Sequence, residues 1–329
     1  MADLKSFDQT KLKAFENAAA GHDGVLLDES GELVIKPCTA DEVDFYQESI
    51  SQHPKFYELM PTFMGTLTLG APAQVLDPTA AQEELTQEQK DQSLLHGKAL
   101  TTETAIVLEN LEHGFKQPNV LDLKLGSRLW AEGTKPEKAE RLDKVAAETT
   151  SGSLNFRIAG MKVWNGQGFD IYDKFYGRKF SKDNVKDGFA AFFSSLSAGV
   201  PKDDARLLLE TILADITKAR HSLERSESRM YGASILVVYE GDNEALDTIM
   251  RGPPKAPGGD ERAPTTLEVK QSQEEDEEED EDAPPVAHRV KMIDFAHAQW
   301  TPGEGPDENV IKGLKNIEDQ MDTLIALVD

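Results

Sequence analysis

An acid and a base stand two residues apart inside an apolar run. Residues 118–126 read PNVLDLKLG, in which Asp122 and Lys124 alternate with leucines. Side chains of a β-strand alternate between its two faces, so the carboxylate and the ammonium project together while the leucines pack behind them. Phosphoryl transfer can use such a pair when a second carboxylate holds a metal ion. An ion pair on a solvent-facing strand is the competing interpretation.

Candidates for the second carboxylate and for a phosphate-binding lysine end two other apolar segments. Asp294 follows VKMI and precedes Phe295, which predicts a carboxylate at a strand end beside the core. An aspartate that caps a helix fits the same pattern. Lys36 ends ELVIK, and a strand lysine that reaches the α- and β-phosphates of ATP is a fixed part of protein-kinase-like sites. Most lysines at strand ends, however, lie on the surface.

Several common nucleotide motifs are missing from the sequence. It has no G-x-x-x-x-G-K-[ST] loop and no G-x-G-x-x-G, which excludes a P-loop enzyme and a dinucleotide-binding Rossmann protein. It also lacks H-R-D and D-F-G, so it is not a typical protein kinase. The segment IVLENL nevertheless ends a third apolar strand at Glu109, where the backbone of a hinge between two lobes could hydrogen-bond an adenine. One cysteine, Cys38, excludes a disulfide framework and a cysteine-rich zinc site.

A charged helix is predicted over residues 136–147. Thr134 and Glu137 form a capping box at its start. Three basic residues then recur at every third position, within an arc of about 120°: Lys138, Arg141 and Lys144. They could bind a phosphorylated ligand, or they could belong to a solvent-facing helix with acid–base pairs four residues apart. Those pairs would be Glu137–Arg141 and Glu140–Lys144.

The pattern of elements around these residues predicts an α+β protein with two lobes. Residues 1–110 form a strand-rich lobe that ends in the hinge, with two short strands in 24–36, a helix over 39–50, and strands over 62–70 and 103–110. A polar stretch at 73–100 is interpreted as a loop. Residues 111–329 form the larger lobe, with strands over 120–125, 233–240 and 290–296, a hairpin over 153–177, and helices near 182–197, 201–226 and 309–328.

The net charge of −25 is concentrated in one segment. Nine consecutive acids, Glu274–Asp282, carry −9 of it, and such a block repels itself and stays solvated. We therefore predict a disordered acidic insertion at about 241–287 and no direct binding to nucleic acid. No run approaches 18 apolar residues, so we expect no membrane span. We expect a monomer located in the nucleus and the cytoplasm.

Four segments in a fixed order resemble the inositol polyphosphate kinase family. The first is P-x-x-x-D-x-K-x-G, which begins at Pro118 and ends at Gly126. SLNFRIAGMKVW, GASILVVYE and IDFAHA follow, and Ala233 stands where the family has the first of two serines. The resemblance covers roughly residues 30–329, and the short segment between Gly126 and Phe156 is most like the fungal multikinase branch.

The resemblance implies a two-lobed, protein-kinase-like fold that uses ATP and Mg²⁺, and it implies a role for each candidate residue. Asp122 would reach the ATP ribose and the accepting hydroxyl, and Lys124 the substrate and the transferred phosphoryl group. Asp294 would hold Mg²⁺ with help from Ser234, and Lys36 would bind the ATP phosphates. The remaining positions implied are the adenine hinge, Glu109 to Leu111, and the substrate contacts Lys138, Arg141, Lys144, Lys182 and His297.

The implied activity is phosphorylation of inositol trisphosphate to the tetrakis- and pentakisphosphates at the 6- and 3-hydroxyls. One alternative is an inositol hexakisphosphate kinase, which shares the signature. Another is a nuclear scaffold or transcriptional cofactor whose acidic tract docks transcription factors. Phosphoinositide lipids are further candidate substrates, although no polybasic or amphipathic anchor is present.

Overall fold

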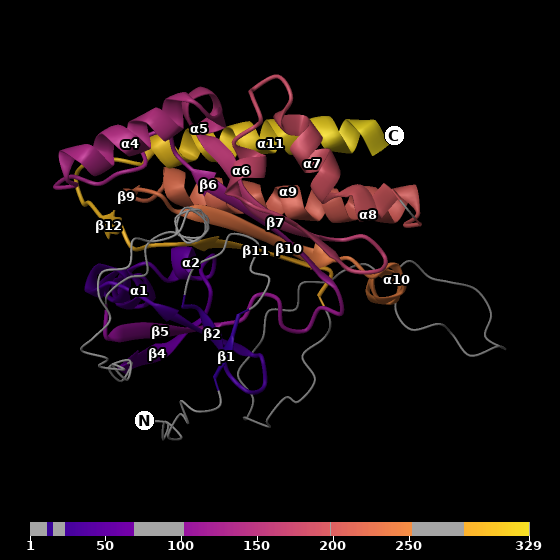
Figure 1. Ribbon diagram of the computed structural model, residues 1–329, viewed down its shortest axis with the longest axis horizontal. Helices are drawn as coiled ribbons and strands as arrows, with labels where there is room; N and C mark the ends of the chain where they lie inside the picture. The colour runs from indigo at the N-terminus through magenta and orange to yellow at the C-terminus, as the bar shows by residue number, and fades with distance from the viewer. Residues whose placement is uncertain (1–11, 16–23, 69–101, 198, 252–285, 329) are drawn as a thin grey trace, which may run out of the picture.

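The computed structural model describes residues 12–15, 24–68, 102–197, 199–251 and 286–328. The polar stretch at 73–100 and most of the predicted insertion, including the nine acids, lie outside these ranges. The described chain forms two five-stranded antiparallel sheets and one two-stranded sheet. Figure 1 shows the first sheet below the second, with the long helices on the far side of the second.

The first sheet has the strand order β1-β2-β3-β5-β4. Its strands are β1 (Lys13–Ala14), β2 (Leu26–Leu27), β3 (Leu33–Pro37), β4 (Phe63–Thr68) and β5 (Thr104–Glu109). The predicted turn before β3 is confirmed, since the Leu33 amide donates to Asp28 Oδ1 at 3.0 Å. Helix α1 (Ala40–Gln52) begins as predicted after Thr39, whose hydroxyl accepts from the Glu42 amide. The short α2 (Pro54–Tyr57) follows, with proline in its first turn.

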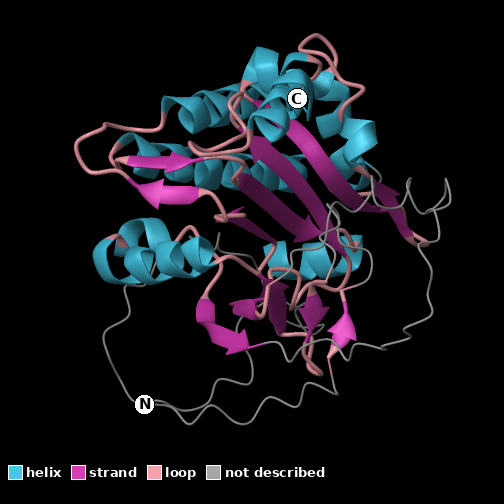
Figure 2. Cartoon of the chain, turned by 60° about the vertical axis from the view of Figure 1, so that its left-hand side comes forward, coloured by secondary structure: helices cyan, strands magenta, loops and turns pink. Residues whose placement is uncertain are grey.

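The second sheet has the order β11-β10-β6-β7-β8. Its strands are β6 (Pro118–Leu125), β7 (Phe156–Trp164), β8 (Phe169–Tyr172), β10 (Ser234–Glu240) and β11 (His288–Ile293). One face is apolar: the β6 leucines are fully buried and join the main core. Figure 2 shows helices layered on one face of this sheet. The alternation of apolar residues along β6 therefore assigns the polar residues to the opposite face, toward the first sheet.

The helices that follow β6 along the chain are α4 (Pro136–Ala147), α5 (Thr150–Leu154), α6 (Lys174–Gly177), α7 (Val185–Phe192), α8 (Ser194–Ser197), α9 (Lys202–Glu224), α10 (Asn243–Arg251) and α11 (Glu308–Val328). Strands β9 (Ser228–Met230) and β12 (Ala298–Trp300) pair with each other. Among the described residues, no helix has both the length and the apolar character needed to cross a bilayer.

Four local predictions are wrong. The second strand of the predicted hairpin ends at Tyr172, because the Asp173 side chain caps α6. The helix predicted over 182–197 is divided into α7 and α8. Helix α4 has the predicted bounds, but Lys135 precedes it without a side-chain cap, so the capping box is not formed. The insertion predicted from 241 begins with a helix, α10, whose Leu246 is buried.

The α+β prediction is confirmed, and one hydrophobic core connects the two main sheets. Phe295, just after β11, packs against Phe45 of α1, with ring centroids 4.9 Å apart. Trp300 stacks on the other side of Phe45 at 5.2 Å. The Met292 amide also donates to the Leu59 carbonyl at 2.7 Å. The residues on either side of Asp294 are thus fixed to both parts of the molecule; a division into lobes at 110/111 stays a prediction.

Candidate active site

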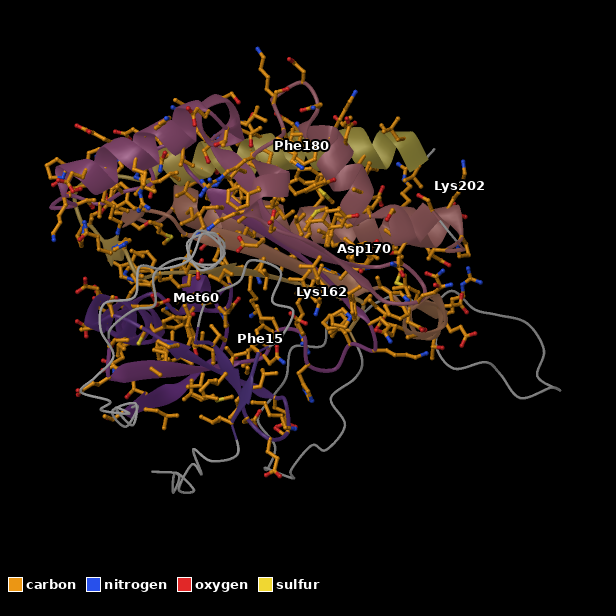
Figure 3. The ribbon with its side chains drawn as sticks, viewed as in Figure 1. Phe15, Met60, Lys162, Asp170, Phe180 and Lys202 are labelled. Atoms are coloured by element: carbon orange, nitrogen blue, oxygen red, sulfur yellow. The ribbon has the colours of Figure 1, made fainter. Side chains whose placement is uncertain are left out.

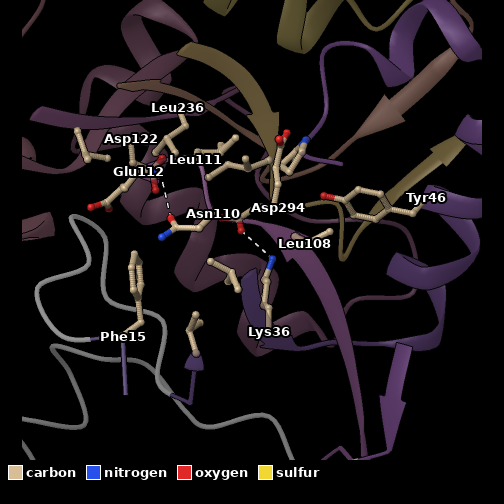
Figure 4. Close-up of a pocket in the computed structure, with 16 residues that line it drawn as sticks. Phe15, Lys36, Tyr46, Leu108, Asn110, Leu111, Glu112, Asp122, Leu236 and Asp294 are labelled. Atoms are coloured by element: carbon tan, nitrogen blue, oxygen red, sulfur yellow. Dashed lines mark hydrogen bonds and ion pairs between the residues drawn. The ribbon is translucent and has the colours of Figure 1, made fainter. Parts of the chain in front are cut away.

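Three of the predicted residues meet between the two main sheets, although up to 258 residues separate them in sequence. Lys36 Nζ donates to Asp294 Oδ1 at 2.9 Å, and Lys124 Nζ donates to Asp294 Oδ2 at 3.1 Å. Figure 4 shows Lys36 from the first sheet pointing at Asp294 from the second. Each of the two carboxylate oxygens of Asp294 therefore faces one ammonium group.

The sequence interpretation missed Glu42 as a member of this cluster. Its Oε1 accepts from Lys36 Nζ at 2.9 Å and from the Phe295 amide at 3.2 Å. Burial alone would lower the pKa of Lys36, but the charges of Asp294 and Glu42 outweigh burial and raise it. A signal was present in the sequence: Glu42 lies in the buried stripe of α1, at helical spacing from Phe45 and Tyr46.

The backbone of Asp294 has an uncommon conformation. Its φ is +66°, in the left-handed region that residues other than glycine rarely adopt. Such a conformation costs on the order of 1–3 kcal/mol and persists when the surroundings impose it. Here both neighbours of Asp294 are held in place, because Ile293 is the last residue of β11 and Phe295 is buried in the core. The conformation directs the carboxylate to the two lysines instead of continuing the strand.

Asp122 and Lys124 share one face of β6, as their spacing predicts. Asp122 is 1% exposed and lines the pocket beside Asp294, which excludes the solvent-facing interpretation. Lys124 also donates to the Gly232 carbonyl at 2.8 Å. The strand must then turn away at Gly126, which has a φ of +89°. A β-carbon there would contact Asn309, with Cγ only 3.0 Å away, so glycine is required.

Ser234 opens β10, directly opposite Lys124 on one side and Ile293 on the other. Its hydroxyl is fully buried and has no hydrogen-bond partner among the described residues. Buried hydroxyls are normally satisfied, so this one is suited to a group that is bound during function.

A pocket adjoins the cluster and has an apolar floor (Figure 4). Leu111, Val120, Leu236 and Ile293 form this floor and pack in one cluster with the buried Val238. The pocket is also lined by Lys36, Asp294, Asp122, Glu109 and Leu111, so it brings together all the positions predicted for nucleotide binding except Ser234.

The predicted hinge, Glu109 to Leu111, connects β5 to this pocket. The Glu109 carboxylate accepts from the Thr62 amide at 2.9 Å, and the Asn110 amide donates to the Glu32 carbonyl at 2.7 Å. The Leu111 carbonyl accepts from Arg289. Within the described part of the chain, the Leu111 amide makes no backbone or side-chain hydrogen bond, so it can donate to a ligand.

A buried ion pair next to the hinge was also missed. Glu112 lines the pocket and pairs with Lys162 of β7, which is 6% exposed. Burial raises the pKa of Glu112, and the charge of Lys162 partly offsets that rise. Figure 3 shows Lys162 beneath the second sheet, on the side of the first sheet.

The predicted substrate residues are only partly brought together. Lys138 and His297 line a second pocket between α4 and α1, and His297 lies three residues from Asp294. Burial lowers the pKa of His297, and the charge of Lys138 lowers it further. Arg141 and Lys182 are exposed, and no contact joins either to the Lys36–Asp294 cluster among the described residues. Lys144 pairs with Glu148 at 3.8 Å, and the two predicted pairs of α4 are not formed.

The site has three features of a phosphotransferase of protein-kinase-like design. A strand lysine is held by a helix glutamate, a carboxylate of the type that binds metal ions lies beside it, and an apolar pocket adjoins a hinge. Residues 105–322 match the family model "Inositol polyphosphate kinase". This chain belongs to the inositol polyphosphate kinase family.

Curated relatives support this assignment over nearly the whole chain. The inositol polyphosphate multikinase of Saccharomyces cerevisiae is 31% identical, over 93% of this chain and 97% of the relative. That of Schizosaccharomyces pombe is 30% identical, over 93% and 96%. Inositol hexakisphosphate kinase 1 of Rattus norvegicus is 34% identical, over 64% of this chain and 49% of the relative.

Solved structures agree with the fold. The inositol phosphate multikinase Ipk2 of S. cerevisiae, in complex with ADP and Mn²⁺, has a TM-score of 0.64 and 27% identity, covering 90% of this chain and all of the other. A second inositol phosphate multikinase structure, with a TM-score of 0.52 and 19% identity, shows the same fold.

Proposed function

We propose that this protein is an ATP- and Mg²⁺-dependent kinase of soluble inositol polyphosphates that converts inositol trisphosphate to the tetrakis- and pentakisphosphates at the 6- and 3-hydroxyls. The observation that carries the proposal is the position of Asp294 between Lys36 and Lys124, in the wall of a largely apolar pocket. Two cations and one carboxylate on rigid elements suit a reaction that depends on positioning and on neutralising charge.

In this proposal the nucleotide occupies the pocket of Figure 4. The adenine lies on the floor of Leu111 and Val120, where the Leu111 amide donates to it. Asp122, buried on the same side of the pocket, accepts from the ribose. Lys36, kept charged by Glu42, binds phosphate oxygens. The ADP in the related S. cerevisiae structure supports a nucleotide in this fold.

The residues present fit a magnesium ion. Mg²⁺ in kinase sites usually takes one or two carboxylates and completes its shell with substrate phosphates and water. Asp294 supplies the carboxylate, and the buried Ser234 hydroxyl supplies a hard oxygen nearby. Within the described ranges no group of three or more acidic, histidine or cysteine side chains is placed to hold a metal, which agrees with ligands contributed by the nucleotide. The bound ion would neutralise charge on the transferred phosphoryl group.

Lys124 and Asp122 face the acceptor. Lys124, positioned by the Gly232 carbonyl and Asp294, stabilises the charge that develops on the transferred group. Asp122 orients the attacking hydroxyl. Lys138 and His297, which line the second pocket, bind phosphates of the inositol. Arg141, Lys144 and Lys182 are the further phosphate contacts of the proposal.

An inositol hexakisphosphate kinase is the second candidate. Similarity to those enzymes covers 64% of this chain, against 93% for the yeast multikinases, which favours the multikinase. The test is to incubate the purified protein with ATP, Mg²⁺ and inositol 1,4,5-trisphosphate, and in parallel with inositol hexakisphosphate, and to separate the products by chromatography. Tetrakis- and pentakisphosphates from the trisphosphate support the proposal. A pyrophosphorylated product from the hexakisphosphate alone would establish the second candidate.

Further parts of the proposal concern the whole protein. We propose a nuclear and cytoplasmic monomer whose acidic tract, Glu274–Asp282, docks basic surfaces of transcription factors. Phosphoinositide headgroups, which share the phosphorylated inositol ring, are proposed as secondary substrates. Separate loss of partner binding on deletion of the tract, and of kinase activity on mutation of Asp294, would show two independent roles.

A further inference from the structure

Two arginines lie next to each other beside the catalytic strand β6. Arg157 of β7 is directly opposite Lys124 in the sheet, so the two side chains share a face. Arg178 follows Gly177, the last residue of α6. A β-carbon on Gly177 would overlap the carbonyl oxygen of Ile158, so α6 is packed directly on the backbone next to Arg157. The fold thus places Arg178 at Arg157.

Among the described residues, few acceptors face these two guanidinium groups. Arg157 donates from Nη1 to the Ser151 hydroxyl at 2.9 Å. The Nε of Arg178 is buried and has no hydrogen-bond partner among the described residues, and the guanidinium carbon lies 5.4 Å from the centre of the Phe175 ring. A guanidinium has five donors in a planar fork, so most of this capacity is unused.

The local charge balance favours an anion. Burial and the neighbouring charge of Arg178 lower the pKa of Arg157 to about 10, and Asp122 offsets this only in part. Lys124, directly opposite, adds a third cation, which shares the Asp294 carboxylate with Lys36. Adjacent half-buried cations repel each other, and a doubly charged oxyanion between them would both relieve the repulsion and accept the unused hydrogen bonds.

We propose that Arg157 and Arg178 form a phosphate-binding subsite that holds one phosphomonoester of the inositol substrate next to Lys124. The position of the subsite favours the inositol substrate as the ligand. Ser151, which contacts Arg157, belongs to α5, and α5 packs against α4, so the subsite lies between strand β6 and the predicted substrate helix. A planar guanidinium group can donate two parallel hydrogen bonds to the oxygens of one phosphate. The identity of the ligand rests on the proposed function; the existence of the anion site does not.

The test compares Arg157→Gln and Arg178→Gln with Arg220→Gln. Arg220 is a matched control because its guanidinium is already satisfied by Glu318 and Glu224, both at 2.8 Å. We expect Arg157→Gln and Arg178→Gln each to raise KM for inositol trisphosphate about tenfold or more, which is the effect of losing a charge-assisted hydrogen bond. KM for ATP should stay within about twofold of the parent value. Arg178→Gln should not lower Tm, since it removes repulsion, whereas the control should lower Tm and leave both KM values unchanged.

A KM for inositol trisphosphate within twofold of the parent in folded Arg178→Gln would overturn the subsite, and so would a rise in KM for ATP alone. Arg157→Gln also loses the Ser151 contact, so Arg178→Gln decides the matter if the former does not fold. If the parent does not phosphorylate inositol trisphosphate, the proposed function has failed, and inorganic phosphate becomes the probe. Stabilisation of the parent by phosphate that is lost in Arg178→Gln would uphold the anion site. Equal stabilisation of both proteins, or none, would overturn it.

Discussion

At the scale of single residues, the site is held by charges that burial would otherwise disfavour. Lys36 is charged because two carboxylates surround it, and Asp294 is held in a left-handed conformation because both its oxygens face ammonium groups and Phe295 is locked in the core. Removing one partner of such a network leaves an unmatched buried charge, which is costly. The network should therefore respond sharply to single substitutions.

Glu42→Gln tests this network. The side-chain oxygen of the new glutamine can still accept from the Phe295 backbone amide, but Lys36 loses one of its two charged partners. We expect a fall of about tenfold or more in kcat/KM for ATP, since kinase-like sites need the lysine–glutamate pair in place, and a loss of about 1–3 kcal/mol in the free energy of unfolding.

Steady-state kinetics and urea unfolding measure the two effects. The control is Asp319→Asn, an exposed acid of α11 that lines neither the pocket of Lys36 nor the pocket of Lys138. A variant with kcat/KM for ATP within twofold of the parent would show that Asp294 alone orients Lys36.

At the scale of elements, strand β6 and helix α4 show how far sequence patterns reach. The alternation along β6 predicted the shared face of Asp122 and Lys124, because a strand has only two faces. The bounds of α4 followed from helical periodicity. The capping box failed because α4 begins one residue later than the box requires, with Lys135 as its N-cap, and the Thr134 amide closes a turn on the Ala131 carbonyl instead.

Contacts between distant segments were harder to predict. Nothing in the spacing of Lys36 and Asp294 indicates that they meet; the resemblance to a known family carried that expectation. Glu42, Glu112 and Arg157 were missed because charged residues are usually exposed, and only the assembled fold shows which ones are buried. Helix α10 was missed because it directly precedes a segment with a disordered composition.

Lys138→Ala tests the position of α4 relative to His297. Burial and the charge of Lys138 lower the pKa of His297, so removing that charge should raise the pKa toward its usual value near 6.5. Because the folded state favours neutral His297, the parent should lose stability as pH falls through about 6.5, and the variant should lose less.

Titration of His297 by NMR measures the pKa directly. Lys144→Ala is the matched control, because Lys144 pairs with Glu148 and does not act on His297. An unchanged pKa in Lys138→Ala would mean that α4 lies farther from His297 than the second pocket requires.

The triple variant Lys138→Ala, Arg141→Ala, Lys144→Ala tests substrate binding by α4. Cations that bind a highly charged ligand should raise KM for inositol trisphosphate by about tenfold or more when removed, with KM for ATP unchanged. Exposed residues that only pair with neighbours should cost a few tenths of a kcal/mol each and change neither constant. An unchanged KM in a folded variant would move the substrate toward Lys124, Arg157 and His297.

At the scale of the whole molecule, the acidic insertion is attached away from the proposed site. Arg251, which ends α10, donates from Nε to Asp204 of α9 at 3.0 Å, and His288, which begins β11, contacts Asp215 of α9 at 3.0 Å. Helix α9 lies on the face of the second sheet that points away from the first sheet (Figure 1). Both described ends of the insertion are therefore held on the helical layer.

Removal of residues 257–286 should leave kcat within about twofold of the parent, since a self-repelling acidic tract has no apolar surface with which to pack on a core. Kinetics of the deletion variant with inositol trisphosphate measure this, and Tm checks that the shortened connection still permits folding. A large fall in kcat at unchanged Tm would show that the segment contributes to the site.

The most direct test of the account is the turnover of Asp294→Asn. Asparagine tolerates the left-handed backbone at this position and keeps one oxygen acceptor, so the variant should still fold. Its Tm should fall by several degrees, because Lys36 and Lys124 lose the charge that both of them face. Turnover of ATP with inositol trisphosphate should fall about 10²-fold or more, as expected for losing a key electrostatic group. Asp170→Asn, an exposed aspartate of β8, should have no effect. A folded Asp294→Asn variant that keeps more than about a tenth of the parent's turnover would contradict the account.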